Sequence, residues 1–386
     1  MTTETPGALA GLIVVETAER VSGEYTGKLL ADLGAQVIKV ERPGGAPTRA
    51  MGPFRDGESV LFAYLNTNKQ SVVLDVENPD ERALLRRLLD RAHALVDDHD
   101  ETGVRRLGLD PEQVAARHPA LVHTLVTPFG QGAPEQFQNL RPINVINAGG
   151  WAYHSPSETP RGKPPLKGAG RFLSDYEAGI DAALCTMASL LRLRRTGQGQ
   201  SIDISEVEVQ LNRIDCVLDR MLAGDADPSE ERTAYDMGGP GTSFACADGH
   251  VFLFMTTSQH WKALCALMGE PGWAAAFRED WLEFDCTPAN VASFRAGFSE
   301  WIALQHKLPI TEAAQKAGVA MVPVNTAADL PVHEQFVHRA YFQPADHPTL
   351  GEVAYPGACY RMSATPARVR TPAPTLGADQ REVDRA

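Results

Sequence analysis

Residues 12–126 alternate short apolar segments with segments of helical periodicity, and this alternation constrains the fold of the 386-residue chain more than any other feature. Segments with the length and content of buried strands recur at 12–15, 37–40, 71–76, 94–96 and 121–126. Helices are expected at 25–33, at 79–92 with Asn78 as its N-cap, and after Asp110-Pro111. Strands separated by helices predict a parallel sheet with right-handed crossovers. The expected fold class is therefore α/β, with a Rossmann-like large domain.

The turn after the first strand argues against the most common ligand of such a sheet. Residues 16–24 contain a single glycine, Gly23, where a dinucleotide site needs the GxGxxG pattern that brings the backbone close to a pyrophosphate. We therefore do not expect NAD or FAD to bind.

The stretch 171–205 predicts a long helix and a short strand. Ser174 and Glu177 fit a capping box, and Gly197 follows the last expected turn. One buried face is expected from the apolar residues Tyr176, Ile180, Ala183, Leu184, Met187, Leu190 and Leu191. Asp175 would then lie in the first turn, where the helix dipole favours an ionised carboxylate. A second helix with one apolar face is expected over residues 207–221.

Composition and charge exclude several classes of partner. The formal net charge of -13 argues against nucleic acid and anionic membranes. No run approaches 18 apolar residues, and the N-terminus lacks the basic segment of a signal peptide. The six scattered cysteines without a CxxC motif predict reduced thiols in a cytoplasmic protein, and the eleven dispersed histidines predict no metal site.

The rest of the chain predicts a second, smaller region. Residues 132–167 are rich in Pro, Gly, Asn and Gln, so we expect an irregular surface stretch there. The polar segment 224–231 is a candidate linker, and Asp248-Gly249 between two apolar runs predicts a hairpin. Further elements are expected as helices at 258–268, 289–304 and 310–317 and as strands at 320–324 and 351–354.

Several short motifs occur in a fixed order along the chain. They are LLADLGAQVIKVE at 29–41, NTNKQSVVL at 66–74, RLGL at 106–109, TGQGQSIDIS at 196–205, Asp248-Gly249, GVAMVPV at 318–324 and APTL at 373–376. Taken together, they make the chain resemble the family III CoA-transferases, the CaiB–BaiF family, over nearly its whole length. The resemblance includes the formyl-CoA transferases and, more distantly, the 2-methylacyl-CoA racemases.

This resemblance implies an enzyme that moves CoA from an acyl-CoA donor to a small carboxylic acid. Asp175 matches the catalytic aspartate, which would form an aspartyl anhydride and then an aspartyl-CoA thioester. CoA would be a substrate, and no tightly bound cofactor is implied. The implied architecture is an interlocked, ring-like homodimer. In each chain, residues 1–223 and 326–386 form the large CoA-binding domain and 224–325 the inserted small domain.

The resemblance also implies a CoA site. It places Arg42, Leu74, Asp75 and Arg106 at CoA contacts. At two positions that depart from the family pattern, we also expect His99 to stack on adenine and Arg141 to bind a CoA phosphate or a substrate carboxylate. Gly238, Gly239 and Gly241 match a glycine-rich loop that covers the active site. Lys69 matches a lysine that supports the neighbouring loop.

Two segments depart from the family pattern. Residues 97–102 read DDHDET instead of ENFRPG, so Asp100 stands where an arginine would contact CoA. Residues 141–144 read RPIN instead of the racemase motif HDIN, and arginine is too weak an acid to shuttle protons. Two alternatives stay open: an acyl-CoA racemase, isomerase or lyase that uses Asp175 as a base, and a non-catalytic protein whose CoA site has decayed.

Overall fold

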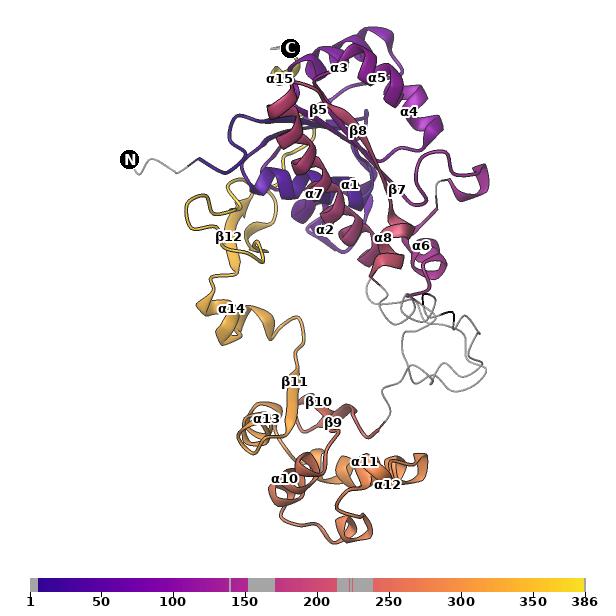
Figure 1. Cartoon of the computed structure of the whole chain (residues 1–386). Coiled ribbons are helices and arrows are strands. Elements are labelled where there is room, and N and C mark those ends of the chain that lie inside the picture. The colour runs from indigo at the N-terminus through magenta and orange to yellow at the C-terminus, as the bar shows by residue number, and fades with distance from the viewer. Residues whose placement is uncertain are drawn as a thin grey trace. The chain divides into compact units, whose positions relative to one another are not determined.

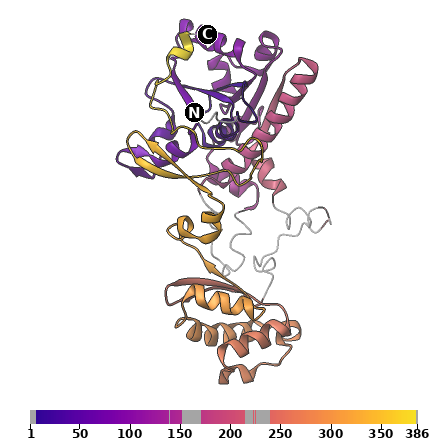
Figure 2. The ribbon, with the colours of Figure 1, turned by 90° about the vertical axis from the view of Figure 1, so that its left-hand side faces the viewer.

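The computed structural model describes residues 6–138, 140–151, 171–213 and 239–384, together with Leu222 and Gly224. The chain forms two compact units. The first is built from Met1–Pro228 and Ala340–Ala386, and the second from Ser229–Arg339. In Figures 1 and 2 the first unit carries the indigo, magenta and yellow segments, and the second unit the orange ones.

A six-stranded parallel sheet is the centre of the first unit. Its strand order is β5-β2-β1-β6-β7-β8, which is the order of a doubly wound Rossmann-type sheet. The strands are β1 (Ile13–Glu16), β2 (Gln36–Glu41), β5 (Lys69–Val73), β6 (Ala94–Asp97), β7 (Val122–Thr127) and β8 (Gln200–Ser205). The α/β class and the parallel sheet expected from the sequence are confirmed.

Helices cover both faces of this sheet because successive strand residues point to opposite sides. Val14 and its neighbours pack under α1 (Val21–Asp32) and α7 (Leu173–Thr196). Val15 and its neighbours pack against the helices of the other face, which are α3 (Pro79–Arg91), α4 (Glu101–Leu107) and α5 (Pro111–Arg117). The Asn78 and Asp110 side chains cap α3 and α5 as expected.

The N-terminal half of α7 differs from the prediction. The helix begins at Leu173 with Phe172 as its N-cap, so Ser174 does not form a capping box. The face packed against α1 consists of small residues, and a Cβ atom at Gly179 would lie 2.9 Å from the carbonyl oxygen of Ser22. Of the residues predicted to be buried, the exposed ones are Ile180, Leu184 and Leu191, at 47%, 65% and 51%. The backbones of α1 and α7 approach so closely that only small side chains fit between them. The large apolar side chains of α7 lie on its other sides.

Shorter elements complete the first unit. They are β3 (Phe54–Arg55), β4 (Glu58–Ser59), α2 (Val60–Leu65), α6 (Pro142–Ala148), α8 (Glu206–Asn212), β12 (Phe342–His347), β13 (Gly351–Pro356) and α15 (Arg381–Asp384). Helix α6 lies inside the stretch that we expected to be irregular, where Pro142 at the first helical position favours a helix start. The helix expected over 207–221 is described as α8, and residues 214–221 lie outside the described part.

The end of the chain returns to the edge strand β5. The Asp379 N–H donates to the Ser71 carbonyl at 2.9 Å, and the Ser71 N–H donates to Asp379 Oδ2 at 3.0 Å. Gln380 makes a similar pair of hydrogen bonds with Val73. The backbone groups of an otherwise open sheet edge are therefore occupied.

The second unit contains a small antiparallel sheet and a helical cover. Strands β9 (Thr242–Cys246), β10 (Gly249–Phe254) and β11 (Ala320–Val324) form the sheet. The helices are α10 (Ser258–Met268), α11 (Trp281–Phe284), α12 (Pro288–Ile302), α13 (Lys307–Lys316) and α14 (Glu334–His338). Trp261, Trp281 and Phe294 pack together in its core. The hairpin at Asp248-Gly249 and the three predicted helices are confirmed.

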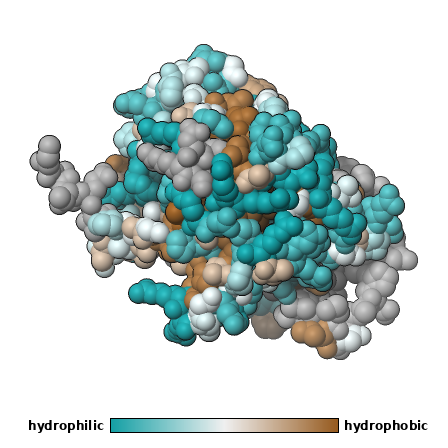
Figure 3. All heavy atoms as spheres, turned by 90° about the horizontal axis from the view of Figure 1, so that it is seen from above, coloured by the Kyte–Doolittle hydropathy of each residue, from teal (hydrophilic) through white to brown (hydrophobic). Residues whose placement is uncertain are grey.

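The surface of the chain is mainly polar. The face shown in Figure 3 is predominantly hydrophilic, with smaller hydrophobic patches between the polar residues. Within the described ranges, no helix combines the length and the apolar content needed to cross a membrane.

Candidate active site

The turn from β1 to α1 lies where the strand order of the sheet reverses, between β1 and β6. Ligands of such sheets bind at this edge, beyond the carboxyl ends of the strands. The backbone N–H groups of Glu19 and Arg20 donate to the two oxygens of Asp98 at 2.8 and 2.7 Å. Burial raises the pKa of Asp98 to about 7. Asp97 accepts from the Thr17 hydroxyl at 2.5 Å, so Asp97 and Asp98, the first two acidic residues of the unusual 97–102 segment, both support this turn.

A fully buried group of charges lies beneath the turn. Lys39 Nζ is 3.0 Å from Glu16 Oε1 and 2.9 Å from Glu24 Oε1. Lys69 Nζ is 2.8 Å from Glu16 Oε2 and also donates to the Glu24 carbonyl oxygen. Burial opposes the charge on Lys39, but the carboxylates of Glu24 and Glu16 outweigh it and raise the pKa of that lysine. The group joins β1, α1, β2 and β5, and Lys39 also donates to the Ala18 carbonyl oxygen of the turn at 2.8 Å.

Asp175 is the third residue of α7 and is 4% exposed. It lines a cavity of about 1280 Å³ together with Arg20, Arg141 and Arg171. Burial is the largest effect on its carboxyl group and raises its pKa, and the charge of Glu206 raises it further. The Ser174 hydroxyl, 3.2 Å from Asp175 Oδ2, opposes this shift, as does Arg20. Burial therefore acts against the ionised form that the helix N-terminus was expected to favour.

A second cavity, of about 240 Å³, adjoins the first, since Glu19, His99 and Arg106 line both. Five of the predicted CoA-binding residues meet in it, namely Arg42, Leu74, Asp75, His99 and Arg106. Leu74 is buried in its floor. The side chains of Arg42 and Arg106 are both 54% exposed, with carboxylates of Glu19 and Glu77 at 3.4 Å. Such exposed ion pairs are weak, so both guanidinium groups are available to an incoming anion.

His99 is a cation in this site. Burial opposes its charge, but the carboxylates of Asp97, Asp98 and Glu19 prevail and raise its pKa to about 9. Its Nδ1 lies 3.1 Å from Asp97 Oδ2. A charged imidazole favours contact with a phosphate as well as stacking on a base.

Asp100, which departs from the family pattern, has a local role. It is the N-cap of α4, and its carboxylate accepts from the Gly103 N–H at 2.8 Å. An acidic residue at the N-terminus of a helix is favourable, so helix capping explains an aspartate at this position without any ligand.

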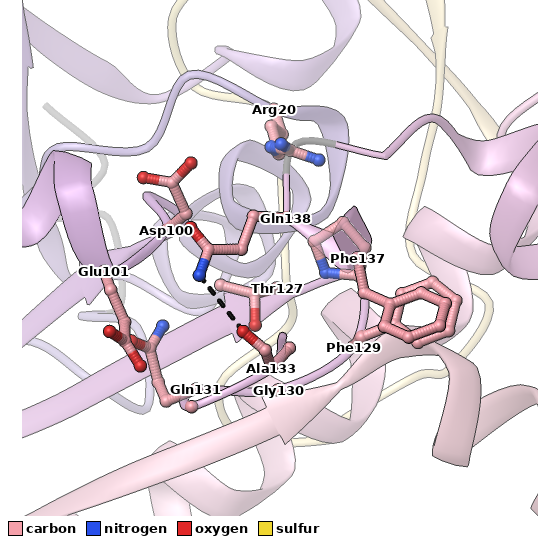
Figure 4. A pocket seen from close by; sticks show the side chains of 12 residues that line it. Arg20, Asp100, Glu101, Thr127, Phe129, Gly130, Gln131, Ala133, Phe137 and Gln138 are labelled. Carbon is pink, nitrogen blue, oxygen red and sulfur yellow. Dashed lines mark hydrogen bonds between the residues drawn. The ribbon is translucent and has the colours of Figure 1, made fainter. Parts of the chain in front are cut away.

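A small alcove opens beside the main cavity, at the carboxyl end of β7 (Figure 4). Phe129 and Phe137 stack at 5.2 Å along one side, and the Gln138 side-chain amide donates to the Ala133 carbonyl at 3.1 Å. Its volume of about 10 Å³ fits a water molecule. Arg20 lines both the alcove and the main cavity.

The remaining predicted residues have different outcomes. Arg141 precedes α6 and lines the cavity of Asp175, where its backbone N–H donates to Asn144 Oδ1 at 2.9 Å. Gly239 and Gly241 precede β9 in the second unit, and Gly238 lies outside the described residues. A role of these glycines in covering the site stays a prediction.

Sequence reasoning missed three residues near Asp175, which are Arg20, Ser22 and Glu206. Glu206 is 2% exposed and accepts from the Ser22 hydroxyl at 2.7 Å. Arg20 follows β1 closely and Glu206 directly follows β8, so a search of the residues beyond the carboxyl ends of the parallel strands could have found them.

Comparison with known proteins defines the class that this fold and site belong to. The family model described as CoA-transferase family III matches residues 9–380, and the chain belongs to this family of enzymes. The succinate–glutarate CoA-transferase of Agrobacterium fabrum is 30% identical, over 97% of this chain and 94% of that protein. The acetyl-CoA:oxalate CoA-transferase of Acetobacter aceti is 29% identical, over 86% of each chain.

A solved structure agrees with this assignment. The crystal structure of a CaiB/BaiF family protein from Brucella suis superposes with a TM-score of 0.85 at 25% identity, covering 98% of this chain and 99% of that one. The resemblance inferred from the motifs is therefore confirmed, and the protein is an acyl-CoA:carboxylate CoA-transferase.

Proposed function

We propose that Asp175 is the nucleophile of this CoA-transferase. Its carboxylate attacks the carbonyl carbon of the donor thioester, and the CoA thiolate leaves as a mixed anhydride forms. The thiolate then attacks the aspartyl carbonyl of the anhydride and releases the donor carboxylate, which leaves an aspartyl-CoA thioester. The acceptor carboxylate repeats the two steps in reverse order, which regenerates free Asp175 and yields the new acyl-CoA.

The carrying observation is that Asp175 lies in a large cavity that adjoins the cavity of the CoA-binding candidates. We infer that the phosphates of CoA bind Arg42, Arg106 and His99, and that its thiol end reaches toward Asp175. The first residues of α7 have N–H groups without helical partners, which are suited to stabilise the oxyanions of each step.

A dicarboxylic acid is the substrate class that the cavity favours. A carboxylate that does not react needs a cation beside the nucleophile, and Arg20, Arg141 and Arg171 line the cavity of Asp175. The relatives described above are named for succinate, glutarate and oxalate, which are all dicarboxylic acids. We therefore propose a dicarboxylate as the donor acyl group, the acceptor, or both.

The test is covalent trapping. The enzyme is incubated with succinyl-CoA and hydroxylamine, and peptides are searched by mass spectrometry for a hydroxamate at Asp175. We expect the adduct in the wild type and loss of transfer in Asp175→Asn. Asp181→Asn, which removes an aspartate of the same helix that pairs with Arg213 at 2.8 Å, is the matched control. Full transfer by Asp175→Asn would refute the proposal.

One observation favours an alternative. A carboxyl group with a raised pKa is suited to proton transfer, so Asp175 could act as a base on the α-carbon of an acyl-CoA. Solvent deuterium would then enter that carbon without a carboxylate acceptor, and no adduct would form on Asp175.

The non-catalytic alternative has less support. The altered residues of the 97–102 segment bind the β1–α1 turn and cap α4. Arg42, Arg106 and His99 still line one cavity. Calorimetry with CoA distinguishes the two: micromolar binding supports an intact site, and the absence of binding supports decay.

We also propose that the enzyme works as a homodimer. The apolar residues Ile180, Leu184 and Leu191 repeat along the solvent-exposed side of α7, and a second copy would remove them from water. Leu184→Glu is expected to shift the mass in light scattering from two chains toward one, whereas Glu208→Gln on α8 leaves it unchanged. An unchanged mass in both variants contradicts this interface.

A further inference from the structure

Glu206 is a buried carboxyl group that the reaction described above does not use. It is the first residue of α8, directly after the carboxyl end of β8. Its side chain is almost completely buried, and its Oε1 accepts a hydrogen bond from the Ser22 hydroxyl at 2.7 Å. An ionisable group is rarely buried this deeply without a functional or structural reason.

The packing of α1 against α7 brings Glu206 to the nucleophile. Ser22 lies on α1, and its carbonyl oxygen faces Gly179 of α7 so closely that a Cβ atom there would be 2.9 Å away. Asp175 is four residues before Gly179, which is one turn earlier on the same side of α7. Ser22 therefore contacts Glu206 on one side and the helix of Asp175 on the other.

The electrostatic effects agree with this arrangement. The Glu206 charge raises the pKa of Asp175 beyond the shift caused by burial. Burial also raises the pKa of Glu206, and the Ser22 hydroxyl and Arg20, which stabilise its ionised form, offset part of that rise. The other groups that act on Asp175 are the Ser174 hydroxyl, its own backbone N–H and Arg20, which favour its charge.

We propose that Glu206 is a positioning residue for the transfer reaction: its carboxylate, held by Ser22, disfavours a second negative charge on Asp175 in the free enzyme. The inference rests on the proposed role of Asp175 as nucleophile. A carboxylate whose negative charge is disfavoured is a stronger nucleophile once it is ionised, because nucleophilicity rises with basicity. As a consequence, a smaller fraction of the enzyme has an ionised Asp175 at low pH.

The test is the pH dependence of kcat/KM, which reports ionisations of the free enzyme. Glu206→Gln keeps the size of the side chain and an acceptor for the Ser22 hydroxyl but removes the charge. We expect its acid limb to move to lower pH than in the wild type, with a lower maximum at high pH. Glu208→Gln, an exposed glutamate two residues away on α8, is the matched control and is expected to keep the wild-type profile.

A second measurement keeps the inference separate from the proposed function and from folding defects. The yield of trapped adduct on Asp175 is followed against pH, and circular dichroism verifies that each variant is folded. No adduct in the wild type refutes Asp175 as nucleophile. An adduct with the same pH dependence in wild type and Glu206→Gln refutes only the role of Glu206.

Ser22→Ala provides a test if Glu206→Gln does not fold. It removes the hydroxyl that favours the ionised form of Glu206, so more of Glu206 is neutral at a given pH. The acid limb is expected to move in the same direction as in Glu206→Gln, by less. An unchanged or opposite shift would overturn the inference.

Discussion

At the scale of single residues, the site is defined by charges whose environment changes their ordinary behaviour. His99 is protonated near neutral pH because of its carboxylate neighbours, whereas Asp175 resists ionisation because it is buried. From residue type alone we would expect the reverse, a mostly neutral histidine and an ionised aspartate. Both side chains line the cavity proposed for the substrate.

The affinity for CoA is expected to fall as pH rises through about 9, because His99 then loses its positive charge. His99→Gln should bind CoA about tenfold to a hundredfold more weakly at pH 7, the effect of losing a charge-assisted hydrogen bond of about 1.5–3 kcal/mol. The variant should also show a flatter pH dependence. Titration calorimetry between pH 7 and 10 measures both. His118→Gln, which changes a histidine that lines neither cavity, is the control.

Asp175→Asn is expected to stabilise the protein at neutral pH. A carboxyl group whose pKa is raised by folding favours the native state fully below its unfolded pKa of about 4 and loses that contribution as pH rises through its folded pKa. The asparagine side chain does not titrate. The free energy of unfolding in urea should therefore differ little below pH 4 and favour the variant increasingly from there to pH 8. A difference that is independent of pH would contradict the assignment.

At the scale of elements, helix α7 shows what sequence periodicity could and could not predict. Its existence, its C-terminal glycine and the position of Asp175 in its first turn were predicted correctly. The buried face was predicted only in part: Ala183 and Leu190 are buried, whereas Ile180, Leu184 and Leu191 are exposed. Periodicity identifies an apolar stripe but not which neighbour covers it. The interface with α1 depends on the absence of side-chain atoms at Gly179, which leaves no hydrophobic signal.

Gly179→Leu is expected to destabilise the first unit by about 1–3 kcal/mol, since the added side chain meets the Ser22 carbonyl and the Tyr25 ring. The change should also reduce transferase activity, because α1 carries the β1–α1 turn. Urea unfolding and steady-state kinetics measure the two effects. Ala188→Leu, at an exposed position of the same helix, should leave both unchanged within error.

Helix-capping residues and family motifs predicted local structure and the CoA-binding cavity best. Asn78 and Asp110 began their helices as predicted, and five of six expected CoA-binding residues meet in one cavity. The role of Asp100 was not predictable in the same way. Helix α4, which Asp100 caps, has only seven residues, and a helix this short leaves little periodicity in the sequence to reveal its N-cap.

At the scale of the whole molecule, the first unit is made from both ends of the chain. The Asn68 side chain donates to the Arg368 carbonyl at 2.8 Å and accepts from the Arg370 N–H at 2.6 Å. Arg49 pairs with Glu41 and donates to the Pro374 carbonyl at 3.0 Å. Sequence patterns along 12–126 predict the sheet but contain no information about which distant segment completes its edge.

Removal of residues 369–386 is expected to leave β5 with free backbone groups and to promote association through that edge. The truncated chain should elute as large species in size-exclusion chromatography. A chain that ends at residue 384, which keeps Asp379 and Gln380, should elute as the wild type does. Identical elution of all three would show that the last segment does not protect the edge.

The pairing of β5 with residues near 379 has a consequence for biosynthesis. A ribosome makes the sheet strands first, then the whole second unit, and only at the end the segment that lies along β5. During translation the β5 edge of the sheet therefore stays uncovered until the C-terminal segment has been synthesised. Folding of the first unit is completed only after release of the C-terminus, so chaperone dependence should be greatest during that interval.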